Sequence, residues 1–219
     1  MPDTVVPVRL LSDQIVEAAA VMARAAVDDP IFVHVLPDAT ERVAGVPLLM
    51  QQFVRMALAY GEVWATPAPI RGVACWMAPS HPEITQDARE AAGERKVSDA
   101  FGAEAFARLQ AFRADMGETF GSYLPEPHWH LMWLCVEPSH HGQGIGGSLV
   151  RQLTAHADTE PVACDLFTFV PRTVPLYEHL GFRAVLDTTL SRTGLRVQAM
   201  VRPSLSQREG VPNEDLKTS

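Results

Sequence analysis

Residues 134–147 read LCVEPSHHGQGIGG, an apolar segment that runs into a turn with four glycines. The apolar segment is typical of a buried strand, and Ile145, Leu149 and Leu153 follow at helical spacing. Glycines let the backbone turn tightly and bring its amide groups close to a phosphate, and the positive end of the following helix dipole attracts the same anion. This stretch therefore predicts a strand, a phosphate-binding turn and a helix, in that order.

The same turn also fits GxGxxG, the fingerprint of dinucleotide-binding folds, through Gly142, Gly144 and Gly147. In those folds the strand runs straight into the first glycine, whereas residues 137–141 intervene here. The fingerprint normally opens its domain, and its ribose-binding acid follows at the end of a strand, but Asp165 lies in the middle of an apolar segment. We therefore reject a dinucleotide-binding fold. A tight turn without a ligand remains the alternative.

The rest of the chain alternates between strand and helix patterns. Expected strands cover residues 5–11, 62–65, 72–77, 128–136, 162–170, 182–190 and 195–201, and the last two should form a hairpin. Expected helices follow Ser12 and Thr40 as N-caps, begin at Ile145, and cover residues 174–180, with residues 28–30 ending the first helix. Within residues 80–125, apolar residues at helical spacing predict a helical insertion, either a lid over an acceptor site or extra packing on the sheet. We expect one domain over residues 1–203 and a disordered tail over residues 204–219.

Composition narrows the classes of partner. The formal charge of −8 argues against nucleic acid and against an anionic membrane surface, because both require a basic face. The N-terminus lacks the pattern of a signal peptide, and no apolar run reaches the roughly 20 residues of a membrane span. The chain has three cysteines, and an odd number cannot all pair in disulfides. All three lie in apolar segments, which indicates reduced residues in the core: Cys75, Cys135 and Cys164. We therefore expect a cytoplasmic protein.

Two motifs, taken together, resemble the GNAT superfamily of N-acetyltransferases. Residues 134–146 are similar to its acetyl-CoA motif, Q/R-x-x-G-x-G/A after a strand that ends in Val-x-Pro, and residues 175–182, PLYEHLGF, to its Tyr-Glu-x-x-Gly-Phe segment. The resemblance covers residues 128–183 well and the N-terminal half by element order alone. It implies an α/β (α+β) fold with a mixed, mostly antiparallel sheet flanked by helices, ordered β-α-α-β-β-β-α-β-α-β-β, with the insertion before the fourth strand. Residues 171–177, PRTVPLY, most resemble the puromycin N-acetyltransferase group, which implies a small amine as acceptor.

The resemblance also implies a cosubstrate, acetyl-CoA, and roles for particular residues. Loop amides would hold the pyrophosphate and strand backbone would pair with the pantetheine arm, which gives as cofactor-binding residues Leu134, Val136, His141, Gly142, Gln143, Gly144, Ile145, Gly146, Gly147 and Thr173. Tyr177 would protonate the departing thiolate, since a phenol with a pKa of about 10 stays protonated beside a thiol of about 8.5. His141 replaces the usual Gln or Arg, and Thr173 replaces a frequent Asn, so their side-chain contacts to the cofactor are in question.

His130 is the candidate general base. An aliphatic ammonium has a pKa near 10 and must lose a proton before it attacks a thioester. His130 lies six residues before Val136, like the base of some GNAT enzymes, and imidazole titrates near neutral pH. His128, Glu126 and a water chain without a dedicated base remain alternatives.

The histidines and tryptophans of this strand permit two further readings. His128 and His130, together with the pair at 140–141, could suggest a metal site, but no cysteine or carboxylate completes a set, so we expect no metal. Strand alternation places Trp129 and Trp133 on one face, opposite the two strand histidines. There they would pack in the core or form an aromatic wall for the acceptor.

Direct acetyl transfer to the primary amine of a small molecule, in a ternary complex, is the expected reaction. Two rival functions remain: a GNAT-fold protein that binds acyl-CoA without catalysis, and an enzyme that acetylates protein N-termini or lysines. Tyr177 favours an enzyme over a binding protein. A deep pocket beneath the insertion would favour a small acceptor, and an open groove would favour a protein. A homodimer is left open.

Overall fold

The computed structural model describes residues 5–80, 84–120, 127–160 and 162–204. Ser204 is buried, with 1% of its surface exposed, so the ordered part reaches one residue past the expected boundary. The rest of the expected tail and Glu126 lie outside the described residues, and the disorder of the tail stays a prediction. Within the described residues, no helix combines the length and the apolar character that crossing a membrane requires.

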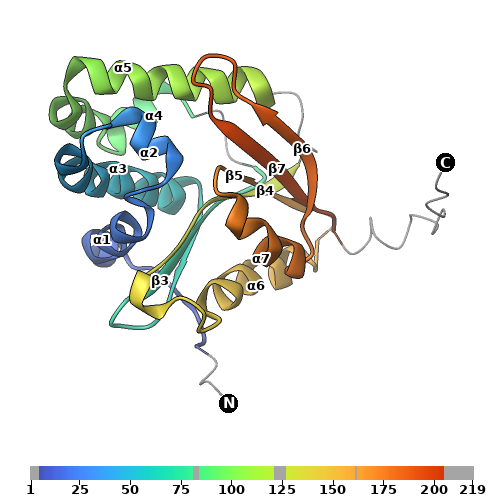
Figure 1. Cartoon of the computed structure of the whole chain (residues 1–219). Helices are drawn as coiled ribbons and strands as arrows, with labels where there is room; N and C mark the ends of the chain where they lie inside the picture. Colours follow the sequence, from blue (N-terminus) through green and yellow to red (C-terminus); the bar gives the residue numbers. More distant parts are fainter. Residues whose placement is uncertain (1–4, 81–83, 121–126, 161, 205–219) are drawn as a thin grey trace, which may run out of the picture.

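A single mixed sheet forms the centre of the molecule (Figure 1). Its strands are β1 (Val8–Arg9), β2 (Gly61–Ala65), β3 (Gly72–Met77), β4 (His128–Val136), β5 (Ala163–Thr168), β6 (Arg183–Thr189) and β7 (Arg196–Arg202). They lie in the order β1-β2-β3-β4-β5-β7-β6, and only β4 and β5 are parallel neighbours. The expected C-terminal hairpin is confirmed, with β7 placed between β5 and β6. The first strand is shorter than expected.

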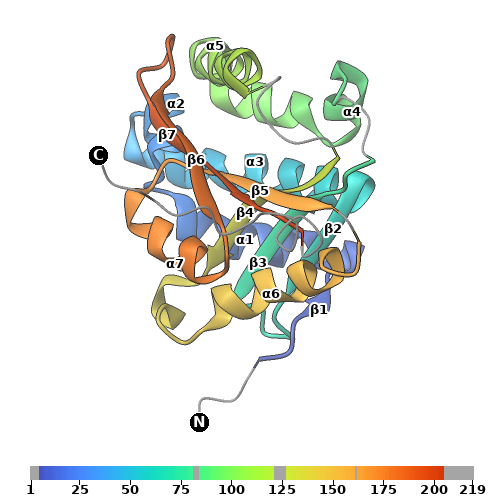
Figure 2. The same cartoon turned by 90° about the vertical axis from the view of Figure 1, so that its right-hand side faces the viewer.

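Helices cover both faces of the sheet (Figures 1 and 2). They are α1 (Ile15–Ala26), α2 (Pro30–Val35), α3 (Ala39–Tyr60), α4 (Gln86–Ala91), α5 (Glu94–Phe120), α6 (Ile145–Ala157) and α7 (Val174–His179), with short 3-10 turns at Ser12–Gln14, Pro138–His140 (η2) and Pro171–Thr173 (η3). Helices α1, α2, α3 and α5 share one apolar cluster, and α6 and α7 share another on the opposite side. This arrangement confirms the expected fold class, and α2 is one helix more than the expected order has between the first two strands.

Three helix starts differ from expectation. Ser12 is not an N-cap: it is the first residue of the 3-10 turn Ser12–Gln14, and Gln14 precedes α1. Asp38, and not Thr40, caps α3: its carboxylate accepts hydrogen bonds from the backbone amides of Thr40 (2.8 Å) and Glu41 (2.9 Å). Residues 28–30, the expected end of the first helix, also lead into α2, a helix that the sequence patterns did not predict. There Asp29 accepts a hydrogen bond from the Ile31 amide at 2.9 Å, and Pro30 occupies the first helical position, where its missing N–H is not needed.

The described part of the predicted insertion, residues 84–120, is helical and packs on the rest of the domain. Its long helix, α5, kinks at Gly102, whose φ of 70° suits glycine. Buried Glu94 at its start accepts a hydrogen bond from Arg113 at 2.7 Å, and Arg113 in turn bonds to Gln52 of α3 at 3.2 Å. Apolar residues of α5 join the core: Val97, Phe101, Ala105 and Leu109. These contacts fix α5 against α3.

A second anchor joins α5 to the hairpin of β6 and β7. Asp115 is fully buried, and its carboxylate accepts hydrogen bonds from Ser191 Oγ, the Arg192 amide, the Thr193 amide and Thr193 Oγ1 at 3.0–3.2 Å. Burial alone would raise the pKa of Asp115, but these four donors hold it below its ordinary value. The insertion therefore connects the two halves of the sheet.

A bulge in β4 overturns the expected placement of its tryptophans. The neighbouring residues Trp76 and Cys75 of β3 pair with Leu131 and Trp133, so β4 contains one extra residue between these pairs. An extra residue reverses the alternation of side chains beyond it. Trp129 therefore packs in the α6 cluster, whereas Trp133 stacks on Phe32 of α2 at a ring distance of 5.4 Å. The two tryptophans lie on opposite faces, and Trp133 shares a cavity with His130.

Candidate active site

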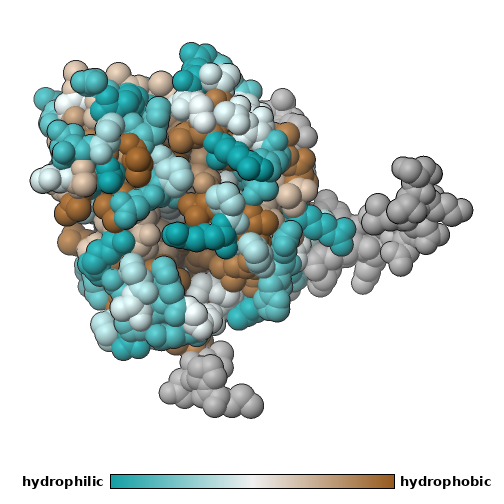
Figure 3. Space-filling view, viewed as in Figure 1, coloured by the Kyte–Doolittle hydropathy of each residue, from teal (hydrophilic) through white to brown (hydrophobic). Residues whose placement is uncertain are grey.

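Two adjoining cavities flank the outer half of β4. The first has a volume of about 220 Å³ and the second about 450 Å³. They share six lining residues, at what we call the junction: Asp29, Trp133, Leu134, Val170, Thr173 and Tyr177. Apolar residues show near the centre of the molecular surface, bordered by polar residues (Figure 3). Two ligands bound in these cavities would therefore meet at the junction.

The start of α6 forms one end of the second cavity. Gly144 precedes the helix with a φ of 79°, a conformation that favours glycine, and no side chain caps the helix there. The first helical hydrogen bond runs from the Ser148 amide to the Gly144 carbonyl, so the amides before it have no partner inside the helix. A Cβ atom on Gly146 would lie 3.6 Å from Leu134 and Val136, which shows how closely the turn approaches β4. Backbone amides at a helix start suit a phosphate.

The lining of this cavity includes all but one of the predicted cofactor residues. Those present are Leu134, Val136, His141, Gly142, Gly144, Ile145, Gly146, Gly147 and Thr173. Gln143 is exposed and does not line the cavity. The parallel pairing of β4 with β5 runs from His128 to Leu131, whereas β4 continues to Val136. Strand β4 therefore extends along the second cavity, beyond its ladder with β5.

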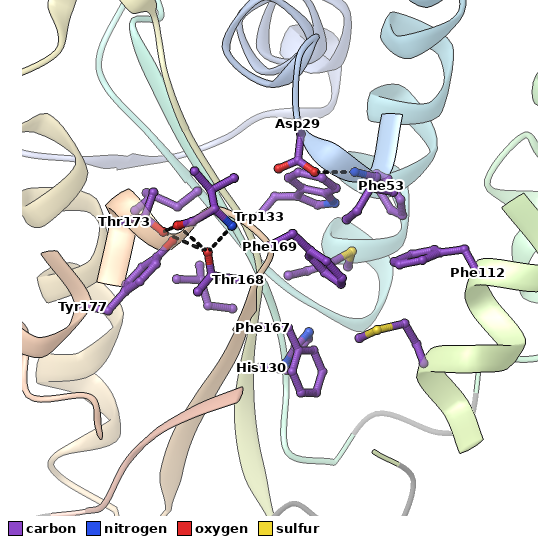
Figure 4. A pocket seen from close by; sticks show the side chains of 16 residues that line it. Asp29, Phe53, Phe112, His130, Trp133, Phe167, Thr168, Phe169, Thr173 and Tyr177 are labelled. Carbon is purple, nitrogen blue, oxygen red and sulfur yellow. Dashed lines mark hydrogen bonds between the residues drawn. The ribbon is translucent and has the colours of Figure 1, made fainter. Parts of the chain in front are cut away.

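Two predicted side chains bond within the protein. His141 Nε2 lies 2.9 Å from the Val136 carbonyl oxygen, so the ring is directed at the end of β4. The Thr173 hydroxyl donates to the Val170 carbonyl at 2.8 Å and lies 2.8 Å from Thr168 Oγ1 (Figure 4). These contacts shape the cavity wall, while the backbone of the turn faces the cavity.

Tyr177 lies at the junction. It comes from α7, lines both cavities and is buried. Burial raises the pKa of its phenol above the ordinary value, and the nearby Cys135 and Asp29 add to that effect. The hydroxyl therefore keeps its proton at neutral pH. This is the state that a proton donor requires.

His130 pairs with a carboxylate that sequence reasoning did not connect to it. Its Nδ1 lies 3.0 Å from Oδ2 of Asp165, which is fully buried on β5. His128 Nε2 lies 3.5 Å from the other oxygen of the same carboxylate. When Nδ1 donates to a carboxylate, Nε2 carries the acceptor lone pair. His130 lines the first cavity, and His128 lines neither, so the geometry favours His130 over His128 as a base.

Asp29 is a second ionisable group at the junction. It lies between α1 and α2 and lines both cavities. Burial raises the pKa of its carboxyl to about 6, against the opposing effects of the Ile31 amide and the Arg172 charge. The sequence indicated only a helix end here.

Aromatic and thioether side chains surround the first cavity (Figure 4). They come from α3, α5, β4 and the end of β5: Phe53, Phe112, Met116, Met132, Trp133, Phe167 and Phe169. Trp133 thus forms an aromatic wall, whereas Trp76 and Trp129 pack in the core. Because Phe112 and Met116 belong to α5, the insertion packs on the domain and also forms one wall of the first cavity.

Other reactive side chains are held inert. The three cysteines are free and buried, and burial raises the pKa of Cys135 well above its ordinary value and that of Cys164 to about 12. Both therefore stay as thiols and pack in the core. Across the described part of the chain, His, Cys, Asp and Glu side chains form no group of three or more that could hold a metal ion.

Asp165 could have been found from sequence. A carboxylate inside an apolar strand must have a partner, because an unpaired buried charge is very costly. The strand with His128 and His130 is parallel to it, but the register that pairs His130 with Asp165 comes only from the structure.

Comparison with known proteins agrees with this geometry. A family model described as "Acetyltransferase (GNAT) domain" matches residues 102–184. The fold is similar to a crystal structure of histone acetyltransferase HPA2 and related acetyltransferase from Corynebacterium glutamicum, with 20% identity, a TM-score of 0.67, and 95% of this chain and 98% of that chain covered. Arylalkylamine N-acetyltransferase 2 from Aedes aegypti is similar with 11% identity, a TM-score of 0.57, and 90% and 97% covered. The C-terminal condensation domain of Ebony, solved with beta-alanyl-dopamine, has 10% identity, a TM-score of 0.59, and 90% and 97% covered.

The family match covers most of the candidate site. The family match spans the turn at Gly142–Gly147 and ends just after the Tyr177 segment, which are the two motifs that the resemblance depended on. The likeness of residues 171–177 to the puromycin N-acetyltransferase group stays a prediction. Residues 102–184 therefore match a GNAT acetyltransferase domain, and this match indicates an enzyme of the N-acetyltransferase class.

Proposed function

We propose that this enzyme transfers an acetyl group from acetyl-CoA directly to the primary amine of a small molecule, with both substrates bound at once. One observation carries the proposal: a cavity lined by the glycine turn before α6 adjoins a smaller aromatic cavity, and Tyr177 lines both. Two substrates that meet at a shared proton donor need no covalent enzyme intermediate. A cytoplasmic location and a homodimer stay predictions.

The residues of the second cavity fit acetyl-CoA. Amides at the start of α6 would hold the pyrophosphate, and the backbone of β4 near Leu134 and Val136 would hold the pantetheine arm. Exposed Arg172 lines this cavity and can offer a positive charge to the phosphates. When bound, acetyl-CoA supplies an acetyl group activated as a thioester.

Residues at the first cavity and the junction would accept and donate the protons that the reaction moves. Nε2 of His130, with Nδ1 held by Asp165, is placed to accept the proton that the ammonium of the acceptor must lose. Tyr177 holds its phenolic proton at the junction, where it can be given to the departing sulfur. Aromatic walls exclude water from the first cavity and keep the amine uncharged once it is deprotonated.

Cavity size supports a small acceptor. The first cavity, at about 220 Å³, is below the roughly 300–1,000 Å³ typical for drug-sized ligands. Similar folds occur in an arylalkylamine N-acetyltransferase and in a domain solved with beta-alanyl-dopamine, but also in a structure described as a histone acetyltransferase. Because similar folds occur with both kinds of acceptor, the small aromatic cavity is the observation that supports the small amine.

Release of CoA from acetyl-CoA tests the proposal. Wild-type enzyme is assayed with aromatic and aliphatic primary amines, and with peptides that carry a free N-terminus or a lysine. We expect turnover with small amines and little with peptides, and Tyr177→Phe serves as the matched low-activity control. Faster turnover of peptides would overturn the choice of acceptor. Tight binding of acetyl-CoA without turnover of any amine would overturn the enzyme assignment in favour of a sensor.

A further inference from the structure

The two cavities differ in charge at their ends. Arg172, His140 and His141 line the second cavity and suit phosphate groups, and Arg172 is near enough to Asp29 to favour its ionised form. In the lining described for both cavities, Asp29 is the single carboxylate, and it lies at the junction. The other ionisable groups that line the first cavity are His130 and Tyr177. Negative charge is therefore concentrated where the reacting amine must lie.

Asp29 keeps one carboxylate oxygen available to a ligand. Its Oδ1 accepts the hydrogen bond from the Ile31 amide that caps α2. Within the described residues, the structure gives its Oδ2 no hydrogen bond and no ion pair. The cap fixes the position of the carboxylate, and the surrounding apolar walls strengthen its attraction for a cation.

We infer that Asp29 binds the ammonium group of the acceptor, so that the first cavity selects cationic amines carried on an apolar body about the size of one aromatic ring. This inference rests on the proposed function and names the substrate class for the same site. An ammonium that leaves water for an aromatic cavity must be paired with an anion, and Asp29 supplies one beside the thioester position. The base then takes the proton from an amine that is already placed.

Protonation of Asp29 would cancel this effect. The groups that interact with it electrostatically lie on three elements: Arg172 on η3, Tyr177 on α7 and Cys135 on β4. Tyr177 and Cys135 stay uncharged, because burial raises the pKa of each, whereas Arg172 favours the ionised form of Asp29. With the carboxyl pKa at about 6, Asp29 is ionised at pH 7.5 and loses its charge in mild acid.

The decisive experiment compares two ligands of nearly the same shape. Benzylamine is a cation at pH 7.5, whereas phenylhydrazine, in which an NH replaces the methylene group, is almost neutral. Their dissociation constants are measured by calorimetry on wild-type, Asp29→Asn and Asp38→Asn enzymes saturated with CoA, so that no turnover is needed. Asn caps a helix as well as Asp does, so Asp29→Asn keeps the fold and removes only the charge. Asp38 is the matched control, because it caps α3 away from both cavities.

The expected result is a preference for the cation that depends on Asp29. Wild type and Asp38→Asn should bind benzylamine about 10- to 100-fold more tightly than phenylhydrazine, and Asp29→Asn should lose that preference. Where turnover is measurable, Asp29→Asn should raise the KM for benzylamine and change kcat by only a few fold.

Three outcomes would overturn the inference. The first is a preference that survives in Asp29→Asn, and the second is its absence from wild type. The third is a fall in kcat without a change in KM, which would mean proton transfer in place of binding. A cation preference without turnover of any amine would instead sink the proposed function and leave Asp29 as an ammonium site.

Discussion

Replacing Asp29 with Asn should make the free enzyme more stable, although it removes a charge that the site uses. Burial raises the pKa of this carboxyl from 3.8 to about 6. A raised pKa means that the folded state binds the proton more tightly than the unfolded state does. The free energy of unfolding therefore falls as pH rises from about 4 to about 6, and it does not recover at pH 7.5.

The magnitude follows from the shift. About two pKa units at 1.36 kcal/mol each give roughly 3 kcal/mol, and part exposure of Asp29 reduces this to about 2 kcal/mol. A neutral Asn avoids the loss and retains the cap to the Ile31 amide. For a chain of this size, about 2 kcal/mol corresponds to a rise in Tm of roughly 4–8 °C.

Unfolding by urea, followed from about pH 4 to pH 8, tests the reasoning. The free energy of unfolding of Asp29→Asn should equal that of wild type near pH 4 and exceed it by about 2 kcal/mol above pH 7. Asp38→Asn measures what an exposed capping charge contributes on its own. A variant less stable than wild type at pH 7.5, or a difference that does not change with pH, would refute the argument.

Four further predictions concern the site and its anchor. Tyr177→Phe should lower kcat by about 10²- to 10⁴-fold at unchanged acetyl-CoA affinity and Tm; unchanged kcat would remove Tyr177 from the mechanism. His130→Gln should lose the acidic limb of the kcat/KM profile for benzylamine, measured in the Asp29→Asn background so that Asp29 does not contribute; an unchanged limb would make His130 structural. Gly146→Ala should keep its Tm, because the methyl meets neighbours at an ordinary 3.6 Å, yet weaken acetyl-CoA binding at least about 10-fold by titration; wild-type affinity would contradict the phosphate-binding turn. Asp115→Ala should cost about 3 kcal/mol in urea at neutral pH and less in acid, because a lowered pKa gives stabilisation that is present above the unfolded value of 3.8 and is lost as pH falls through the lower folded value; an equal cost at neutral and acidic pH would contradict it.

Local patterns predicted the turn and its surroundings. The conformation of residues 134–147 is set by residues close by in the chain, namely the apolar segment and the glycines that follow it. Sequence alone therefore places a strand, a turn and a helix there. The same holds for the hairpin near Gly194 and for the helical insertion. A motif in the sequence singled out Tyr177, and in the structure Tyr177 lines both cavities, while its role in proton transfer stays a prediction.

Contacts between side chains on neighbouring strands could not be predicted from local sequence patterns. His130 and Asp165 are 35 residues apart, and their contact depends on the register of β4 with β5. Alternation misplaced Trp133, because a bulge shows no signature within its own strand. Asp29 was read only as a helix end, since the following helix is short and the cavities that meet there are built from distant segments.

The position of β7 in the sheet governs when the enzyme can assemble during synthesis. N-terminal elements leave the ribosome first, and β5 emerges before the strand that pairs with its second edge. Until residues 196–202 are free to insert between β5 and β6, the wall that carries Phe167 and Thr168 has an open edge. Nascent chains stalled in this interval should therefore bind chaperones through β5, and truncation before Arg196 should yield aggregates instead of a weakened enzyme.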